Sequence, residues 1–394
     1  METEPTSVIA FLAIPQEVTE HILKFCHLSD VVHVAETCHD LHELICNSPD
    51  QYLWRELFLS YPFDDPRKST ARRCAVVTDW MGELRARMQA KQVVLAGASN
   101  KHVSLQNALG VLVSAVEFAA SCVEGKPNVE SANLPWVRDI LLRSPVLDDT
   151  TLTEPAERQL RARLRCYLGL SHEDGGTLAS STRLQLIRTA SRAYVYDLRK
   201  YSRETHWGPY TACDEQLILN WEHLEHIMNV VLMNMRDLPL EQYGTVWSSW
   251  GLEATRACSA PSTPNRKAHD WAGVEGKWRR MVCFMDYRDL FAFNTTLQFS
   301  EWNNGPRNPA FFNDGFAEAI RLIEVDLEVL DLDSSPSKFD DPEHPPIVFK
   351  GTSHGMHGSI ARIEGSVRMF ANGVIRWNFV SLIRAGIDLI IPSI

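Results

Sequence analysis

The sequence predicts an α+β protein in which helices come first and strands follow, and two patterns carry this prediction. Between Phe11 and Met235, apolar residues recur at intervals of three and four positions in successive short segments, as they do on one face of an α-helix. After Arg256, apolar and polar residues alternate instead, most clearly from Ile323 to Val329, and such alternation is typical of a half-buried strand. We therefore expect helical segments followed by an antiparallel β-barrel or a sandwich-like domain.

The composition is that of an ordinary globular chain. Of the 394 residues, 45% are hydrophobic and 23% are charged, and this length predicts two or three domains. The net charge of −11 argues against nucleic-acid binding, which calls for a basic face. Glu2 and Glu4 have the wrong charge for a signal peptide, and the longest apolar run, residues 111–123, is too short to cross a bilayer. We therefore expect no membrane contact, and nine scattered cysteines predict a reducing compartment.

Residues 11–58 have the most informative pattern in the chain. Pro15 stands where the first turn of a helix tolerates a residue without an N–H group. Three runs of apolar residues with helical spacing succeed one another: Ile14, Val18, Ile22 and Phe25; Val31, Val34 and Cys38; Leu41, Leu44 and Ile45. Four bulky residues then close the segment: Tyr52, Leu53, Trp54 and Leu57. Three such short helices cannot bury all of these side chains among themselves. The side chains that we expect to contact a partner protein are Leu12, Ile14, Pro15, Val18 and Leu23.

In order and spacing, this segment resembles an F-box. The likeness rests on Leu12-x-x-Pro15-x-Glu17, Ile22-Leu23, Leu28-x-Asp30, Cys38, Leu41, Leu44 and Leu53-Trp54-x-x-Leu57. Val18 in place of a commoner leucine or isoleucine, and the histidines between His27 and His33, depart mildly from the family pattern. The role of the family is to dock a receptor onto the Skp adaptor of an SCF (Skp–cullin–F-box) ubiquitin ligase. The rest of the chain resembles, more loosely, fungal F-box proteins with a helical middle and a β-rich end.

The resemblance implies which side chains carry the contact with the adaptor. Some of them would touch the adaptor and others would hold the helices in place: Leu12, Ile14, Pro15, Val18, Ile22, Leu23 and Trp54.

A helical region follows the F-box-like segment. Apolar positions step by three and four in four stretches: Leu105 to Ala119, Trp136 to Leu141, Leu160 to Tyr167, and Leu184 to Leu198. The strictest spacing runs from Leu217 to Met235 in a helix that we expect Asp214 to open. A single apolar seam of this length is more typical of a core helix than of a coiled-coil partner site. We expect these helices to pack as a bundle or as stacked pairs.

The strand-rich region begins after a polar segment, residues 256–270, which the composition predicts to be a linker. Asn372-Gly373 predicts a hairpin, because both residues tolerate the positive φ angles of a type I′ turn. A second hairpin is expected at Asp286–Asp289, between strands at Trp278–Phe284 and Leu290–Phe293, and a further strand at Ile347–Lys350. Residues 331–346, rich in proline and aspartate, predict a mobile loop.

Two motifs suggest catalysis or metal binding and fail on context. Gly351-Thr352-Ser353-His354-Gly355 matches the G-x-S-x-G elbow of serine hydrolases, but glycines and strand residues follow it where a helix is required. We interpret it as a glycine-rich turn. The cysteines and histidines between Cys26 and Cys46 lack the paired spacing that holds zinc, as do His344, His354 and His357. We therefore expect no metal, no cofactor and no catalytic residue.

Four residues in the strand-rich region are candidates for binding a target: Trp278, Arg280, Arg376 and Trp377. A two-residue turn at Asn372-Gly373 would place Arg368 opposite Trp377, within reach of a cation–π contact. Such a cluster of tryptophan and arginine suits an acidic or phosphorylated peptide. The alternative is that these tryptophans serve only the packing of a small β-domain.

Together, these features predict an F-box at residues 8–59, a helical middle at 77–240 and a β-rich, target-binding domain at 271–394. The predicted function is that of a non-catalytic, substrate-recruiting subunit of an SCF-type E3 ubiquitin ligase in the cytoplasm or the nucleus. Its partners would be the Skp adaptor, a cullin–RING ligase reached through that adaptor, and an unidentified target protein. Two alternatives stay open: an F-box scaffold that delivers nothing for degradation, and a β-domain that holds a small ligand.

Overall fold

The structure is a computed structural model that describes residues 14–68, 79–97, 104–119, 131–149, 152–173, 177–213, 216–238, 252, 269–295, 307–313, 315–330, 341, 344–355, 360–370 and 375–383; at 212, 213, 216, 217 and 383 it describes the backbone alone. The described residues form two compact units. The first holds those up to Arg161 and the second holds those from Ala162. The predicted α+β class is confirmed.

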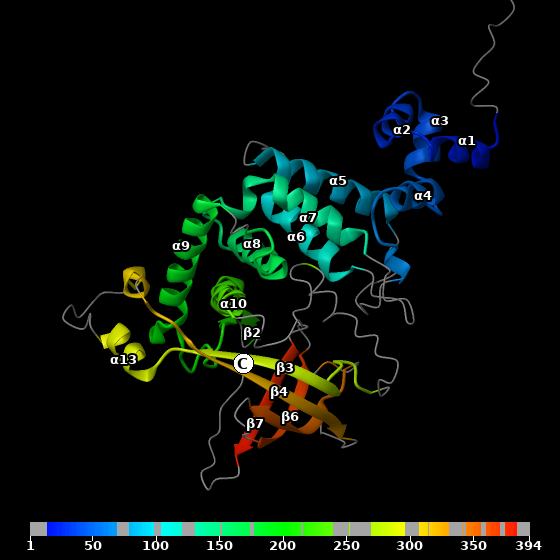
Figure 1. The fold of residues 1–394 in the computed structure, drawn as a ribbon. Helices are drawn as coiled ribbons and strands as arrows, with labels where there is room; N and C mark the ends of the chain where they lie inside the picture. Colours follow the sequence, from blue (N-terminus) through cyan, green and yellow to red (C-terminus); the bar gives the residue numbers. More distant parts are fainter. Residues whose placement is uncertain are drawn as a thin grey trace, which may run out of the picture. The chain divides into compact units, whose positions relative to one another are not determined.

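The described residues of the first unit are helical (Figure 1). The elements are α1 (Gln16–Leu23), α2 (Leu28–Ala35), α3 (His39–Cys46), α4 (Tyr52–Ser60), η1 (Pro66–Lys68), α5 (Trp80–Ala96), α6 (Leu105–Glu117), α7 (Asn133–Arg143), η3 (Pro145–Leu147) and the start of α8 (Pro155–Leu168). The three helices predicted in residues 11–58 are α1, α2 and α3, and the bulky patch that follows them lies on α4. Helices α5, α6 and α7 pack against one another.

Helices α1 to α4 share a small apolar core. Five side chains in it are almost fully buried: Val31, Ile45, Leu53, Leu57 and Phe58. Burying a side chain of this kind stabilises the fold by about 1.5–3 kcal/mol. The indole N–H of Trp54 donates to the carbonyl oxygen of Ile45 across 2.5 Å and so ties α4 to the end of α3.

Helices α1 to α4 connect to α5 within the first unit through contacts made by α4. The rings of Phe58 and Trp80 meet edge to face with centroids 5.4 Å apart. The guanidinium of Arg87 lies over the rings of Phe58 and Phe63, 4.9 Å and 4.6 Å from their centroids. The side-chain oxygen of Gln51 accepts from the backbone N–H of Trp80 at 2.6 Å, at the start of α5. These contacts join α4 to α5 through aromatic packing and a hydrogen-bonded helix start.

The second unit combines helices with two antiparallel sheets (Figure 1). Its elements are the rest of α8, α9 (Leu178–Val195), η4 (Leu198–Lys200), β1 (Tyr210–Cys213), β2 (Gln216–Leu219), α10 (Trp221–Arg236), β3 (Gly276–Phe284), α13 (Tyr287–Thr295), η5 (Pro309–Phe312), β4 (Ala319–Leu330), β5 (Ile347–Gly355), β6 (Ile360–Met369) and β7 (Ile375–Ile383). Strands β1 and β2 form a small hairpin, and α9 packs against α10.

Strands β3 to β7 form one antiparallel sheet in sequential order, which we call the half-barrel. Its inner face carries an apolar core of Val274, Val325, Val329, Ile347, Phe349, Ile363 and Val367. Strands β3 and β7 are at opposite edges of the sheet, yet the rings of Trp278 on β3 and Trp377 on β7 have centroids 5.4 Å apart. This contact shows that the sheet is strongly curled. The predicted antiparallel, barrel-like domain is confirmed in this half-closed form.

A glycine on β6 permits close packing at the inner face. Gly365 pairs with Phe349 of β5 and with Phe379 of β7. A Cβ atom at this position would lie 2.4 Å from the carbonyl oxygen of Asn378 and 2.7 Å from the Cζ atom of Phe349. Only glycine lets a phenylalanine ring approach the strand so closely, which is a common reason for glycine inside a strand.

The hairpin predicted at Asp286–Asp289 is wrong, because a helix, α13, follows β3 instead. The carboxylate of Asp286 accepts from the backbone N–H of Arg288 at 2.8 Å, as aspartate does at a helix start. Leu290 and Phe293, three positions apart, pack in a cluster with Phe312. In so short a segment, the spacing of a helix and the alternation of a strand are difficult to distinguish from the sequence.

The helix expected from Asp214 begins later than predicted. Residues 216–219 form β2, and α10 starts at Trp221, where the side chain of Asn220 accepts from the backbone N–H of His223 at 3.2 Å.

The turn predicted at Gly351–Gly355 is wrong, because this segment lies inside β5, with Ser353 paired to Val325 and Ala361. This strand geometry differs from the strand–turn–helix of a nucleophile elbow.

Several predictions concern residues that lie partly or wholly outside the described ranges. Leu12, Asn372-Gly373 and all but the last two residues of the predicted linker at 256–270 lie outside the described residues, as do most residues of the predicted loop at 331–346. The domain boundaries predicted at 8–59, 77–240 and 271–394 stay a prediction.

Candidate functional site

The first candidate site is an exposed apolar stripe along α1. It consists of Val18 and Ile22 on the helix and of Phe25 just after its end, spaced by four and three residues, and we call it the α1 stripe. These side chains are 45%, 42% and 76% exposed. Apolar side chains so exposed in succession, along one small helix and just past its end, mark an interaction surface more often than isolated exposed residues do.

The start of α1 is held by Pro15, whose carbonyl oxygen accepts from the backbone N–H groups of Val18 and Thr19 at 3.0 Å and 3.1 Å. Pro15 is itself exposed and Ile14 is half-buried. The side-chain amide of Gln16 donates to Glu20 at 3.0 Å on the neighbouring turn. Thus two more of the predicted adaptor-binding residues lie at the accessible beginning of the helix that carries the α1 stripe.

Two of the predicted adaptor-binding residues are buried instead. Leu23 is 2% exposed and Trp54 is 5% exposed, so neither offers a free surface to a partner. Their place in the core fits the role of holding the helices. The sequence motif includes Leu23 and Ile22 equally, whereas the fold buries Leu23 and leaves Ile22 exposed to solvent.

The second candidate site lies on the inner face of the half-barrel. Trp278 and Arg280 are two positions apart on β3, and Trp377 and Phe379 are two positions apart on β7, so each pair shares a face of its strand. The tryptophan rings meet edge to face, and the Arg280 guanidinium lies 5.1 Å from the centroid of the Phe379 ring. We call these four residues the Trp–Arg cluster. Sequence reasoning missed Phe379, although the period of two on β7 places it beside Trp377.

The structure separates Arg376 from this cluster. Val367 pairs with Trp377, and Arg368 pairs with Arg376, so the expected pairing of Arg368 with Trp377 is wrong by one residue. A shift of one residue exchanges the two faces of a strand. Arg376 therefore points away from Trp377, and its guanidinium lies 5.9 Å from the centroid of the Tyr210 ring.

Arg280 is a half-buried cation whose guanidinium lies over an aromatic ring. Among the described residues, no carboxylate forms an ion pair with it and no acceptor hydrogen-bonds to it; its contact is the Phe379 ring. Burial lowers the pKa of the Arg280 guanidinium below its ordinary value. Removing a charge from water without a paired anion is unfavourable, and a bound anion would relieve that cost.

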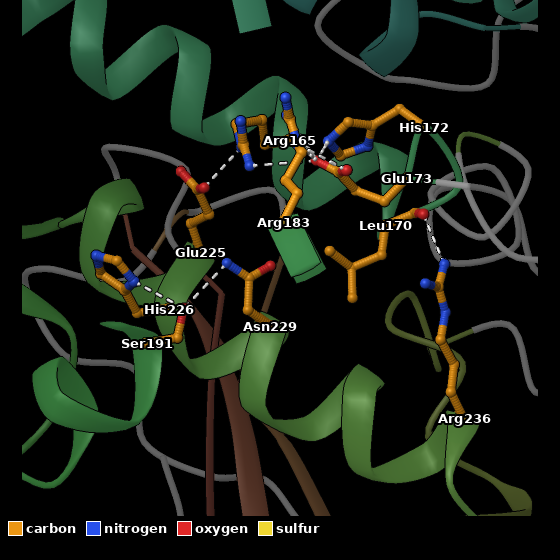
Figure 2. Close-up of polar contacts among 10 residues, drawn as sticks. All are labelled: Arg165, Leu170, His172, Glu173, Arg183, Ser191, Glu225, His226, Asn229 and Arg236. Carbon is orange, nitrogen blue, oxygen red and sulfur yellow. Dashed lines mark hydrogen bonds and ion pairs between the residues drawn. The ribbon is translucent and has the colours of Figure 1, made fainter. Parts of the chain in front are cut away.

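A third group of polar side chains joins α8, α9 and α10 (Figure 2). The Glu173 carboxylate accepts from Arg183 at 2.9 Å and 3.0 Å and lies 3.4 Å from His172. Arg165 on α8 forms an ion pair with Glu225 on α10 at 2.7 Å. Sequence reasoning missed this network, because its members come from separate segments and no local spacing connects them.

Ser191 and His226 in the same region resemble part of a catalytic triad, but their setting is structural. The Ser191 hydroxyl lies 3.0 Å from Nδ1 of His226, and the amide of Asn229 donates to it at 3.3 Å (Figure 2). Ser191 is 1% exposed, so a substrate cannot reach its oxygen. Burial, reinforced by the nearby His223, lowers the pKa of His226 to about 4. The pair therefore serves to fasten α9 to α10.

The described residues lack both a metal-binding cluster and a membrane-spanning helix. They contain no group of three or more histidine, cysteine, aspartate or glutamate side chains arranged to hold a metal ion. None of their helices is both long enough and apolar enough to cross a membrane.

Comparison with known proteins identifies the domain that contains the first candidate site. Residues 11–60 match the F-box-like family, so the chain contains an F-box-like domain, which comprises α1 to α4. No curated protein and no solved structure matches the chain. The likeness to fungal F-box proteins stays a prediction.

Proposed function

We propose that this F-box protein is a non-catalytic, target-recruiting subunit of an SCF-type ubiquitin ligase in the cytoplasm or the nucleus. Its F-box-like domain at residues 11–60 would bind the Skp adaptor, as F-box domains typically do, and its second unit would bind a target protein. The observation that carries the proposal is the α1 stripe, an exposed apolar surface within the matched domain.

The α1 stripe supports adaptor binding on energetic grounds. Val18, Ile22 and Phe25 keep large fractions of their apolar surface in water. Each Å² of apolar surface removed from water contributes about 25 cal/mol, so a partner that covers all three gains affinity from the hydrophobic effect. The side chains beneath, Leu23 and Trp54, belong to the packed core and keep the stripe in one orientation.

The mechanism needs no reaction on this chain. A receptor that holds an adaptor at one unit and a target at the other raises the effective concentration of the target near ubiquitin carried by another enzyme. The side chains described above bind and orient, and the partner enzymes carry out the bond chemistry. This agrees with the buried position of Ser191 and with the strand conformation of Ser353.

The test is co-purification of the full chain with the Skp adaptor, comparing the natural sequence with the double substitution Val18→Asp and Ile22→Asp. We expect a loss of affinity of roughly a hundredfold, because interface hot-spot substitutions cost about 2–4 kcal/mol. The melting temperature should change little, because both side chains are already solvent-exposed. Undiminished co-purification would contradict the proposal.

A matched control is Leu186→Asp on α9, which also places a charge on an exposed leucine, but in the second unit. It should leave adaptor binding unchanged.

A scaffold without a degradative role is distinguished by an experiment in cells. If the protein recruits targets for degradation, proteins bound to the second unit should accumulate when the proteasome is inhibited, and the Val18→Asp and Ile22→Asp substitutions should have the same effect. Bound proteins whose lifetime does not respond to either treatment would favour the scaffold.

A further inference from the structure

The Trp–Arg cluster has the composition of a binding site for a peptide with one negative charge. Trp278 is 41% exposed although its indole N–H is fixed by a 2.8 Å hydrogen bond to the carbonyl oxygen of Val274. Its ring is therefore oriented and accessible at once. Arg280, on the same face of β3, supplies the charge, and Phe379 holds its guanidinium plane from the other side of the curled sheet.

Arg280 differs from the two other cations on β3, which have carboxylate partners. On the opposite face of β3 and β4, Arg279 pairs with Glu324 at 3.6 Å and Lys277 pairs with Asp326 at 3.9 Å. Those cations have carboxylates directly across the ladder. Arg280 instead faces Ile323 across the ladder. A cation that the fold leaves beside apolar residues is suited to an anion that arrives with a ligand.

The number of arginines in the Trp–Arg cluster favours a carboxylate over a phosphate group. Sites for phosphorylated peptides gather several arginines around a group that carries about two negative charges. Here Arg376 lies on the other face of β7. Arg321 on β4 shares the face of Arg280, but it pairs with Val282 and its guanidinium lies 5.1 Å from the centroid of the Phe284 ring, so Arg280 is the one guanidinium of the Trp–Arg cluster. One guanidinium matches one carboxylate, with two parallel N–H···O bonds.

The sheet also offers backbone groups to an extended peptide. Within the part of the chain that the structure describes, β3 and β7 are each paired on one side only, so each has an edge with N–H and C=O groups outside the ladder. Extended peptides bind to such edges by adding a strand, and their alternate side chains then point to one face of the sheet.

We propose that the Trp–Arg cluster binds an extended, acidic segment of the target protein, in which an aspartate or glutamate side chain pairs with Arg280 and an apolar side chain next to it packs on Trp278 and Trp377. The proposal rests on the proposed function, since it names the chemistry by which the second unit would recognise a target. An acidic segment needs no modifying enzyme before it is recognised.

The test uses the immobilised full chain without the adaptor and three libraries of short acetylated peptides. The libraries share randomised flanking positions and differ at a fixed central residue, which is glutamate, glutamine or phosphoserine. We expect the glutamate library to be retained, and peptides selected from it to bind at least about tenfold more tightly than their glutamine versions, a difference of roughly 1.4 kcal/mol.

Arg280→Met should remove this preference, and Arg376→Met is the matched control, an arginine of the same sheet on the other face. Methionine keeps an apolar stem against Phe379, so the Arg280→Met variant should fold and melt no lower than the natural chain. Equal retention of the glutamate and glutamine libraries, or no retention of either, would overturn the proposal. So would a preference for phosphoserine that depends on Arg376.

Because the peptide measurement omits the adaptor, its failure is distinct from failure of the F-box proposal. Acidic peptides that bind while the adaptor does not would leave this inference standing without the ligase role. An adaptor that binds while acidic peptides do not would leave the ligase role and remove the inference.

Discussion

The two compact units differ in the kind of side chain that they leave available to a partner. In the first unit, the F-box helices bury an apolar core around Phe58 and still leave the α1 stripe in water. In the second unit, Arg192 is buried with Glu318 as its partner, whereas Arg280 is half-buried and has no carboxylate partner among the described residues. The α1 stripe is suited to an apolar surface on a partner. Arg280 is suited to a negative charge on a partner. The two units are therefore suited to different partners, one with an apolar surface and one with an acidic segment.

The largest expected effect tests whether the F-box depends on its apolar core. Trp54→Ala removes a buried indole and its hydrogen bond to Ile45, and should destabilise the first unit by about 3–5 kcal/mol. Hydrogen exchange over residues 14–60, followed by mass spectrometry, should show faster exchange there and unchanged exchange in the half-barrel. Adaptor binding should fall in proportion to the unfolded fraction. Loss of binding with normal exchange would show instead that Trp54 touches the adaptor.

A similar effect should come from a buried ion pair in the second unit. The guanidinium of Arg192 donates to Glu318 at 2.8 Å and 2.5 Å, and both side chains are buried. Arg192→Met leaves the carboxylate buried and unpaired, which should cost about 3–5 kcal/mol in chemical denaturation. Adding Glu318→Met should restore most of the loss, because two apolar side chains then replace the pair. If the double variant is as unstable as the single one, the ion pair itself stabilises this unit.

A smaller effect should separate the half-barrel from the helices. Gly365→Ala should destabilise the second unit by about 1–3 kcal/mol, because the added methyl group collides with the Asn378 carbonyl and the Phe349 ring. Gly110→Ala on α6 is the control: open space surrounds its Cβ position, and alanine should stabilise that helix by about 0.8–1 kcal/mol. Thermal unfolding of the two variants should therefore shift in opposite directions. A neutral Gly365→Ala would mean that β6 and β7 can move apart.

The smallest expected effect is a pH dependence of the second unit. Burial lowers the pKa of His226, and of His223, from the ordinary 6.5 to about 4. The unfolded chain therefore binds protons between pH 6.5 and 4 that the folded chain does not, so stability is complete above pH 6.5 and falls as the pH approaches 4. After allowance for solvent, we expect a loss of about 1–2 kcal/mol in this window.

Denaturation of the natural chain and of His226→Gln, compared at pH 7 and pH 4.5, checks this expectation. The substitution should flatten the pH dependence, since glutamine does not titrate. Other groups that titrate in this range, such as carboxylates, contribute equally to both proteins and cancel in the comparison. An identical slope in the two proteins would show that His226 is protonated as easily in the folded state as in the unfolded one.

Some features of the molecule follow from local patterns in the sequence. The spacing of Val18, Ile22 and Phe25 predicts a helix with one apolar side, and the motif around it predicts an F-box, which the family match confirms. The alternation from Ile323 to Val329 predicts β4. Such patterns are readable because the periods of helices and strands are set by the backbone within a few residues.

The tertiary structure alone decided the features that depend on distant residues. The fold buries Leu23 and exposes Ile22; the pairing of β6 with β7, one residue away from the expected register, moves Arg376 out of the Trp–Arg cluster. The curl of the sheet brings Trp278 to Trp377. Register and curl are set by how whole strands and cores pack, and a shift of a single residue exchanges the faces of a strand without altering any local pattern.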